Sequence, residues 1–206
     1  MRQQQSGIRA AFVCWTFLLI LAFSLVFPSV WTWLINVLAE SYNAARFPFL
    51  VAPYFIYALF GFYVLCKGRL FEVLRDEVQE ELQKQQMASL TLAGFCFTSL
   101  GLLVSFFKED IKAHLPGPQT ILTFFAAALG SFIVSYMVLR YRGQRVYSLI
   151  SDASIDNGLW CILAGLLLFC HTTPGLERLP VVFLFVLIAY ALHVALNFYF
   201  YVRFLR

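Results

Sequence analysis

Six long apolar stretches dominate this sequence, and they constrain its fold more than any other feature. A helix rises about 1.5 Å per residue, so roughly 20 apolar residues match the hydrocarbon thickness of a bilayer. None of the six stretches contains Lys, Arg, Asp or Glu. The sequence therefore predicts six transmembrane helices, over Ala10–Phe27, Phe49–Cys66, Met87–Phe107, Ile121–Leu139, Gly158–Cys170 and Val181–Val202.

The composition agrees with a membrane location. Hydrophobic residues make up 61% of the 206 positions and charged residues 13%, against roughly 45–50% and about 25% in soluble domains. The connections between the stretches are too short for a separate soluble domain, so we expect one integral membrane domain over residues 1–206. The fold class is all-α, a polytopic helical bundle, and the lipid bilayer is its first partner.

The distribution of positive charge predicts how this bundle is oriented. Of the 15 Lys and Arg residues, all but Arg46, Lys108, Lys112 and Arg178 lie before the first span or after the second, fourth and sixth. Cytoplasmic loops carry the excess of positive charge, so both termini are expected in the cytoplasm. The fifth stretch is short for a span. We retain it because five spans would place Arg203 and Arg206 outside.

Two further segments have the pattern of helices that do not cross the membrane. Ser29–Ala45 combines Trp31 and Trp33 with polar residues, which suits a helix lying in the outer interface. Arg69–Gln86 has apolar residues at helical spacing among acidic ones, and we interpret it as a cytoplasmic extension of the second helix. The net charge of +4 lies in short clusters beside the spans, which argues against a nucleic-acid partner.

The last span contains the most unusual residue, His193. An ionisable side chain at membrane depth is costly and by default indicates a functional site. Tyr190, Asn197 and Tyr201 share its helical face at i−3, i+4 and i+8. One interpretation is a ligand or pathway site formed by these four residues. The other is a neutral histidine whose hydrogen bonds hold the last helix against its neighbours.

A second candidate site precedes the fifth span, at its predicted cytoplasmic entrance. It contains Asp152, Ser154, Asp156 and Asn157. The spacing is that of the start of a calcium loop, but Leu163 stands where the closing acidic ligand belongs. The alternative is that Asp156 or Ser154 caps the N-terminus of the fifth helix.

The pair Asp152 and Asp156 also resembles part of a known metal-binding motif. Its D-x-x-x-D spacing is similar to the second half of the motif of CDP-alcohol phosphatidyltransferases. The D-G-x-x-A-R half is absent, and Ser148 occupies the place of its glycine. The chain is therefore not assigned to this family.

These observations leave three functional hypotheses. The sequence contains no Walker loop, G-x-S-x-G, H-E-x-x-H or Rossmann glycine pattern, and we predict no catalytic residue, metal site or cofactor. The leading hypothesis is a non-enzymatic protein that forms or regulates a permeation path, as a homo-oligomer or within a membrane complex. The alternatives are an accessory or scaffold subunit, and a metal-dependent lipid enzyme that uses Asp152 and Asp156.

Overall fold

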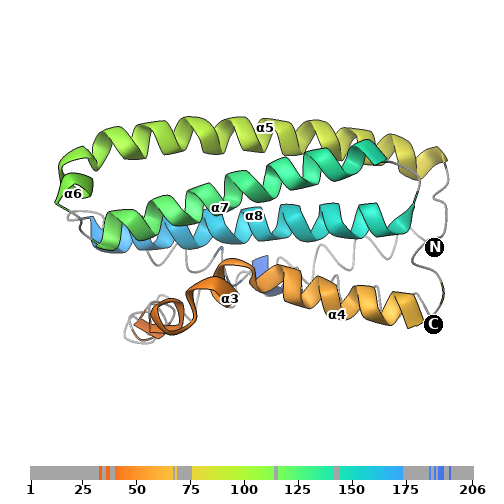
Figure 1. Ribbon diagram of the computed structural model, residues 1–206, viewed down its shortest axis with the longest axis horizontal. Helices are drawn as coiled ribbons and strands as arrows, with labels where there is room; N and C mark the ends of the chain where they lie inside the picture. Colours follow the sequence, from red (N-terminus) through yellow and green to blue (C-terminus); the bar gives the residue numbers. More distant parts are fainter. Residues whose placement is uncertain are drawn as a thin grey trace.

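The protein is described by a computed structural model that covers residues 33, 36–37, 40–66, 68, 76–113, 116–141, 144–173, 186, 188, 190–192 and 195. Every regular element formed by these residues is a helix (Figure 1). The elements are α3 (Arg46–Leu50), α4 (Ala52–Cys66), α5 (Asp76–Phe106), α6 (Lys108–Lys112), α7 (Pro116–Val138), the 3-10 helix η1 (Leu139–Tyr141) and α8 (Arg145–Thr172).

Three of these helices are long and apolar enough to cross a membrane. The segments that qualify are Leu82–Phe106, Gly117–Tyr141 and Arg145–Cys170, of 25, 25 and 26 residues. At about 1.5 Å per residue each is longer than the hydrocarbon core of roughly 30 Å. Helix α4 is also apolar but has only 15 residues. The all-α class is confirmed, and the three long helices indicate a membrane protein.

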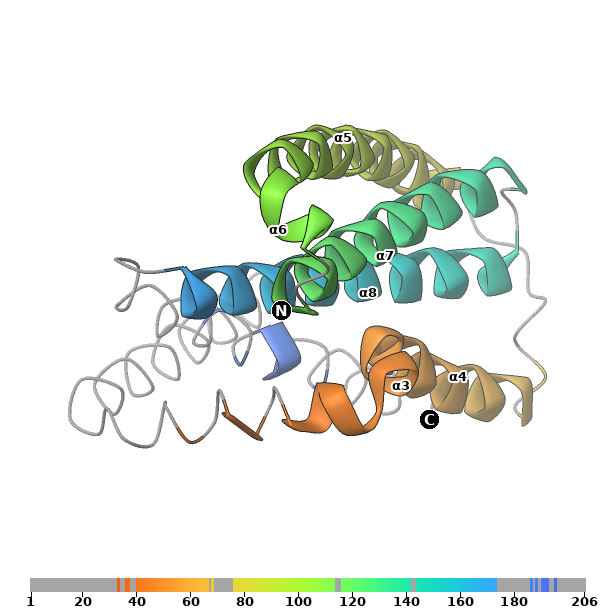
Figure 2. The same cartoon turned by 60° about the vertical axis from the view of Figure 1, so that its left-hand side comes forward.

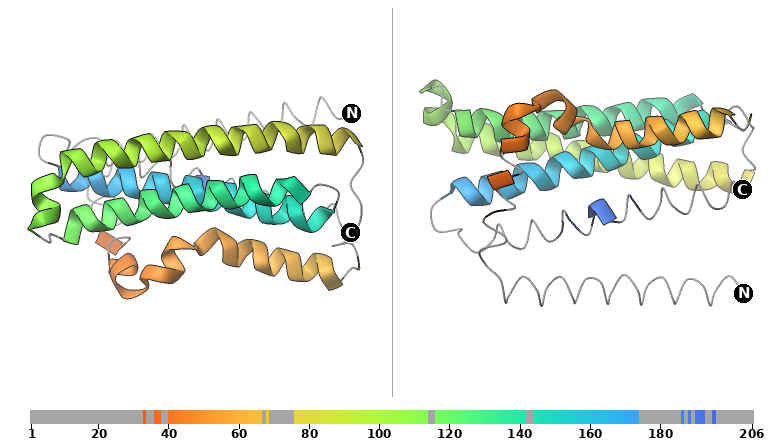
Figure 3. Two further views of the ribbon diagram at one scale, coloured as in Figure 1. Left: turned by 45° about the horizontal axis from the view of Figure 1, so that its top comes forward. Right: turned by 90° about the horizontal axis from the view of Figure 1, so that it is seen from below.

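Helix α8 occupies the centre of the described bundle. It packs against α7 on one side and against α4 on the other, while α5 contacts α7 (Figures 1 and 2). In an apolar 18-residue window of α8, 56% of the residues are buried, against 17% in the corresponding window of α5. The three long helices run in roughly the same direction in both views of Figure 3, and α4 lies along α8 in Figure 1.

The outer face of α5 is apolar and exposed. Phe95, Phe97 and Leu102 have 61%, 71% and 69% of their surface exposed, and Met87 and Phe106 are similar. A contiguous apolar face of this size would be a liability in water. It suits contact with lipid, where no hydrophobic penalty applies.

Two glycines allow α7 and α8 to approach closely. A Cβ atom on Gly158 would lie 2.6 Å from the ring of Phe132, which is fully buried. A Cβ atom on Gly165 would lie 3.0 Å from the ring of Phe125 and 3.1 Å from Cβ of Phe124. The aromatic rings of α7 therefore occupy space that exists because α8 has no side chain at these positions.

The backbone breaks between α3 and α4, within the stretch predicted as the second span. Val51 separates the two helices, and Pro53 falls in the first turn of α4, where its missing N–H costs least. Side chains of α8 bond two carbonyls beside this break. Trp160 Nε1 donates to the Phe49 oxygen at 3.0 Å, and the Cys161 thiol lies 3.4 Å from the Leu50 oxygen.

Replacing Trp160 by phenylalanine is expected to destabilise the protein, because the Phe49 carbonyl then loses the indole hydrogen bond and keeps only its backbone donor. A typical intramolecular hydrogen bond contributes about 0.5–1.5 kcal/mol to stability. The measurement is the thermal unfolding midpoint in detergent, with Trp33→Phe as the control because Trp33 is 62% exposed. Equal midpoints for the two variants would contradict the role given to Trp160.

The structure corrects two predicted boundaries. The helix that contains the predicted fifth span begins at Arg145 and not at Gly158, and it is long and apolar enough to cross a membrane. Asp156 and Ser154 therefore lie inside α8, and the prediction that either caps its N-terminus is wrong. The described part of the predicted extension of the second helix, residues 76–86, instead forms the first turns of α5.

Other predictions fall partly or wholly outside the described residues. This is true of the first span, Ala10–Phe27, and of most of the last, Val181–Val202. In the predicted outer interfacial helix Ser29–Ala45, residues 33, 36–37 and 40–44 are helical. Its position in the membrane interface stays a prediction.

Candidate functional site

The polar side chains of the predicted entrance cluster lie within α8, in the half that begins at Arg145. Asp152, Ser154, Asp156 and Asn157 all belong to the segment Arg145–Cys170 that is able to span a membrane. Ser154, Asp156 and Asn157 are buried. The cluster is therefore a set of polar groups inside the bundle. It is not a loop at its surface.

Asp156 is held by two tyrosines from other parts of the chain. The Tyr57 hydroxyl of α4 donates to Oδ2 at 2.6 Å, and the Tyr190 hydroxyl donates to Oδ1 at 2.6 Å. Both carboxylate oxygens thus accept a short hydrogen bond from a neutral group. This arrangement, which we call the tyrosine clamp, joins α4, α8 and the segment around Tyr190 at one carboxylate.

One turn earlier on α8, Asp152 makes a separate contact. Gln85 of α5 donates from Nε2 to Asp152 Oδ1 at 2.6 Å. Among the described residues neither Asp152 nor Asp156 has a basic partner. Two carboxylates therefore lie one helical turn apart on a helix that can cross a membrane, and the hydrogen bonds described for them come from neutral donors.

Serine hydroxyls connect the three long helices at the level of Asp152. Ser89 of α5 lies 2.9 Å from Ser135 of α7, and Ser135 lies 2.8 Å from Ser151 of α8, oxygen to oxygen. All three are fully buried. Ser89 also donates to the Gln85 carbonyl at 2.9 Å, next to the side chain that bonds Asp152. This serine chain carries hydrogen bonds across the bundle from α5 to α8.

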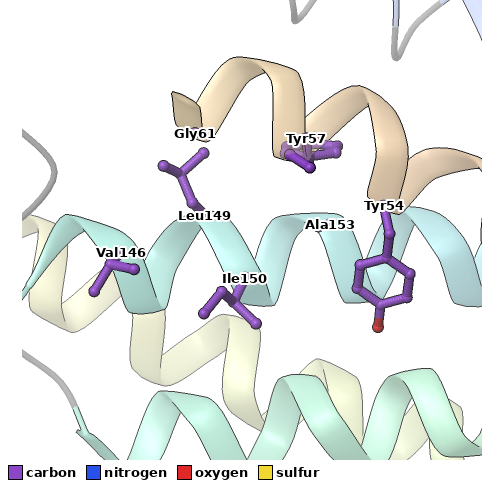
Figure 4. A pocket seen from close by; sticks show the side chains of 8 residues that line it. Tyr54, Tyr57, Gly61, Val146, Leu149, Ile150 and Ala153 are labelled. Atoms are coloured by element: carbon purple, nitrogen blue, oxygen red, sulfur yellow. The ribbon is translucent and has the colours of Figure 1, made fainter. Parts of the chain in front are cut away.

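A groove runs between α4 and α8 beside the clamp (Figure 4). Its volume is about 350 Å³. Tyr54 extends from α4 toward α8 at one end, and its hydroxyl donates to Ser154 Oγ at 2.8 Å. Apart from two tyrosines and one glycine, the lining is aliphatic. The lining residues are Tyr54, Tyr57, Ala58 and Gly61 of α4 and Val146, Leu149, Ile150 and Ala153 of α8.

Removing one hydroxyl of the tyrosine clamp is expected to destabilise the bundle. Tyr57→Phe leaves Asp156 Oδ2 without its donor, and hydrogen bonds to charged groups contribute about 1.5–3 kcal/mol. Tyr54→Phe is the matched control from the same helix. Its effect is expected to be smaller, about 1 kcal/mol, because Ser154 keeps its own bond to the Ile150 carbonyl.

These two variants are compared by their thermal unfolding midpoints in detergent. A larger decrease for Tyr57→Phe is the expected result. A larger decrease for Tyr54→Phe would mean that the contact between Tyr57 and Asp156 contributes little to the fold.

The structure brings together residues from both sites predicted from the sequence. Tyr190, assigned to the face of His193, bonds Asp156, which was assigned to the entrance cluster. His193, Asn197 and Tyr201 lie outside the described residues, so their roles stay predictions. Tyr57 and Gln85 were missed. The only sequence signal for Tyr57 is that it shares a helical face with Tyr54, at i and i+3.

The described residues contain no group of three or more His, Cys, Asp or Glu side chains able to hold a metal ion. Comparisons with protein families, curated proteins and solved structures find no match for this chain. Fold and site together define an all-α membrane protein whose central helix carries two hydrogen-bonded carboxylates.

Proposed function

We propose that this protein forms or regulates a permeation path in a membrane, and that the path transfers protons or is driven by them. The observation that carries the proposal is the tyrosine clamp on Asp156, inside a helix that can cross the bilayer. Charged side chains within transmembrane segments are rare and expensive, and they typically mark ion pathways and proton relays. Such residues face the interior of the bundle, as Asp156 does.

Ion-coupled transport usually places a carboxylate within the membrane-spanning bundle. With the fifth span placed at Gly158–Cys170, no carboxylate lay within a span. With α8 beginning at Arg145, Asp152 and Asp156 both do. Proton transfer needs groups that both donate and accept, and the carboxylates, Tyr57, Tyr190 and the serine chain supply them.

The proposed architecture is a bundle of six transmembrane helices with both termini in the cytoplasm. The end of η1, the start of α8 and the first turns of α5 lie at the same end of the bundle (Figure 1). Arg140 lies in η1, Arg145 begins α8 and Lys84 lies in the first turns of α5, which supports a cytoplasmic location for this end. The proposed assembly is a homo-oligomer or a complex with another membrane protein.

The proposal retains His193, Asn197 and Tyr201 as pathway residues. They follow Tyr190 at helical spacing on the helix predicted for Val181–Val202, so they extend the polar face on which Tyr190 lies. A carboxylate on α8 and a histidine on the last helix would then supply the titratable groups of the path.

The test is proton flux through purified protein in lipid vesicles. Vesicles that contain a pH-sensitive dye are given a pH step, with valinomycin and potassium present to remove the charge imbalance. Faster dissipation of the pH difference than in protein-free vesicles is the expected result. Rates equal to those of empty vesicles, both for the protein alone and for the complex purified with it, would reject the proposal.

A second candidate is an accessory or scaffold subunit of a membrane complex. The observation in its favour is that polar side chains of α8 bond α4, α5 and α7, which is how polar residues hold transmembrane helices together. Capture from mild detergent is the relevant experiment. Recovery of the chain without a second protein, together with proton flux, would favour the first candidate.

The lipid-enzyme hypothesis has no comparable support. Asp152 and Asp156 bond different partners, Gln85 for one and two tyrosines for the other. Their oxygens are therefore engaged separately in the described bundle.

A further inference from the structure

Asn157 has one side-chain atom that the described contacts do not explain. The residue is 1% exposed. Its Nδ2 donates to Ser131 Oγ of α7 at 3.0 Å and lies 3.8 Å from Cys161 Sγ. Within the described residues, Asn157 Oδ1 is buried and has no hydrogen-bond donor. Buried carbonyl oxygens are nearly always paired, so this atom requires an explanation.

The hydroxyl of Ser131, which contacts Asn157, has a hydrogen that it can still donate. Ser131 Oγ accepts the bond from Asn157, and its own hydrogen remains available to donate. Among the hydrogen bonds of the described residues, none takes the Ser131 hydroxyl as donor. An unused acceptor on α8 and an unused donor on α7 therefore belong to two residues that already contact each other.

We propose that a water molecule binds between Ser131 and Asn157 in the interior of the bundle. It accepts a hydrogen bond from the Ser131 hydroxyl and donates one to Asn157 Oδ1. Buried waters typically make about two to four hydrogen bonds to otherwise unpaired polar groups, and these two bonds meet that requirement. Nothing in this proposal depends on the permeation path.

Rotating the amide of Asn157 does not remove the need for a ligand. In the rotated form the Ser131 hydroxyl could donate to Oδ1, but Nδ2 would then turn away from both Ser131 and Cys161. Both N–H groups of Nδ2 would then lose the acceptors that they have in the structure, whereas in the present orientation only Oδ1 lacks a partner. The orientation in the structure therefore leaves fewer polar groups unpaired.

A cation is a poorer occupant than water. A cation in the bundle needs nearby negative charge to offset its desolvation. The adjacent carboxylate, Asp156, already accepts a tyrosine hydrogen bond at each oxygen. Ser131 and Asn157 are neutral, and their open positions are one donor and one acceptor, which is the pattern that a water molecule completes.

The water is tested by radiolytic footprinting of the protein in lipid nanodiscs. An X-ray pulse converts bound water to hydroxyl radicals, which oxidise the side chains beside it. Cys161 is fully buried and lies next to Asn157, so mass spectrometry should find it oxidised in the wild type and several-fold less in Asn157→Leu. Similar oxidation in both proteins, or none in the wild type, would overturn the proposal.

A second variant and a direct observation keep the test decisive if Asn157→Leu does not fold. Ser131→Ala removes the donor to the water and is expected to lower Cys161 oxidation in the same way. In a high-resolution structure of the wild type, we expect a density peak within hydrogen-bond distance of Asn157 Oδ1 and Ser131 Oγ. Absence of density there would mean an empty site, and an anomalous peak after soaking with thallium would mean a bound cation. Either result would contradict the proposal.

Discussion

Replacing Asp156 by asparagine is expected to reduce proton flux into reconstituted vesicles by about tenfold or more, while the protein stays folded. Asparagine has nearly the same shape, and its amide can still bond both hydroxyls of the tyrosine clamp, because a tyrosine oxygen accepts as well as donates. It cannot release or take up a proton in the range in which a carboxylate does. A tenfold loss of rate corresponds to about 1.4 kcal/mol in the barrier to transfer.

The control for this experiment is Glu109→Gln. Glu109 is 79% exposed in α6 and pairs with Lys112 at 3.1 Å, outside the segments able to span a membrane. Its replacement also removes one carboxylate but should leave the flux unchanged. If Asp156→Asn has the thermal unfolding midpoint of the wild type and carries proton flux at the wild-type rate, the proton path does not pass through Asp156. Asp156 is then a structural residue.

Replacing Gly158 by leucine is expected to prevent α7 and α8 from packing, and thus to abolish the folded protein. Even the single Cβ atom of alanine would lie 2.6 Å from the buried ring of Phe132. Inserting a methyl group into a packed interior costs about 1–3 kcal/mol, so Gly158→Ala should lower the unfolding midpoint by roughly 2–4 °C for each kcal/mol in a chain of this length. The measurements are monodispersity in detergent and thermal unfolding.

Gly130 provides the matched control, because a Cβ atom there meets nothing within 4 Å. Gly130→Ala and Gly130→Leu should both give a folded protein, and the alanine variant should gain up to about 1 kcal/mol in helix propensity. Phe132→Leu combined with Gly158→Ala should recover part of the loss, since it removes the ring that the new methyl group meets. Equal tolerance of leucine at both glycines would show that the packing of α7 on α8 is not as described.

The long helices were predictable where their residues are uniformly apolar. The predicted span Met87–Phe107 lies within α5 except for its last residue, and Ile121–Leu139 lies within α7 and the first residue of η1. Apolar composition alone identifies such segments. The start of α8 was not predictable in this way. Its first turns contain Arg145, Asp152 and Asp156, and composition does not show that the two aspartates bond side chains from other parts of the chain.

The site was predictable as separate residues and not as an arrangement. Asp156 and Tyr190 each stood out because they are polar within or beside apolar stretches. Their contact depends on how the segment around Tyr190 lies against α8, which sequence spacing within one helix does not determine. Tyr57 was hidden for the same reason, since a tyrosine in an apolar helix more often packs at an interface than bonds a carboxylate.

Small residues illustrate the same limit. Small residues at helical spacing, here Gly94 and Ser99 in α5 and Gly130, Ser131 and Ser135 in α7, are expected from sequence to permit close helix approach. Ser131 and Ser135 do lie buried against α8 or α5, but both glycines face open space. The close contacts occur instead at Gly158 and Gly165, because the large rings that fill the space over them belong to a different helix.

The most direct test of the central claim is whether α8 crosses the membrane with Asp156 in its interior. Single cysteines are placed at Gln144, Thr173 and Asp156 in a cysteine-free background, and a membrane-impermeant maleimide is added from one side at a time. We predict that positions 144 and 173, which flank α8, are labelled from opposite sides, and that position 156 is protected from both. Labelling of positions 144 and 173 from the same side would contradict the account, because Asp152 and Asp156 would then not lie within a transmembrane helix.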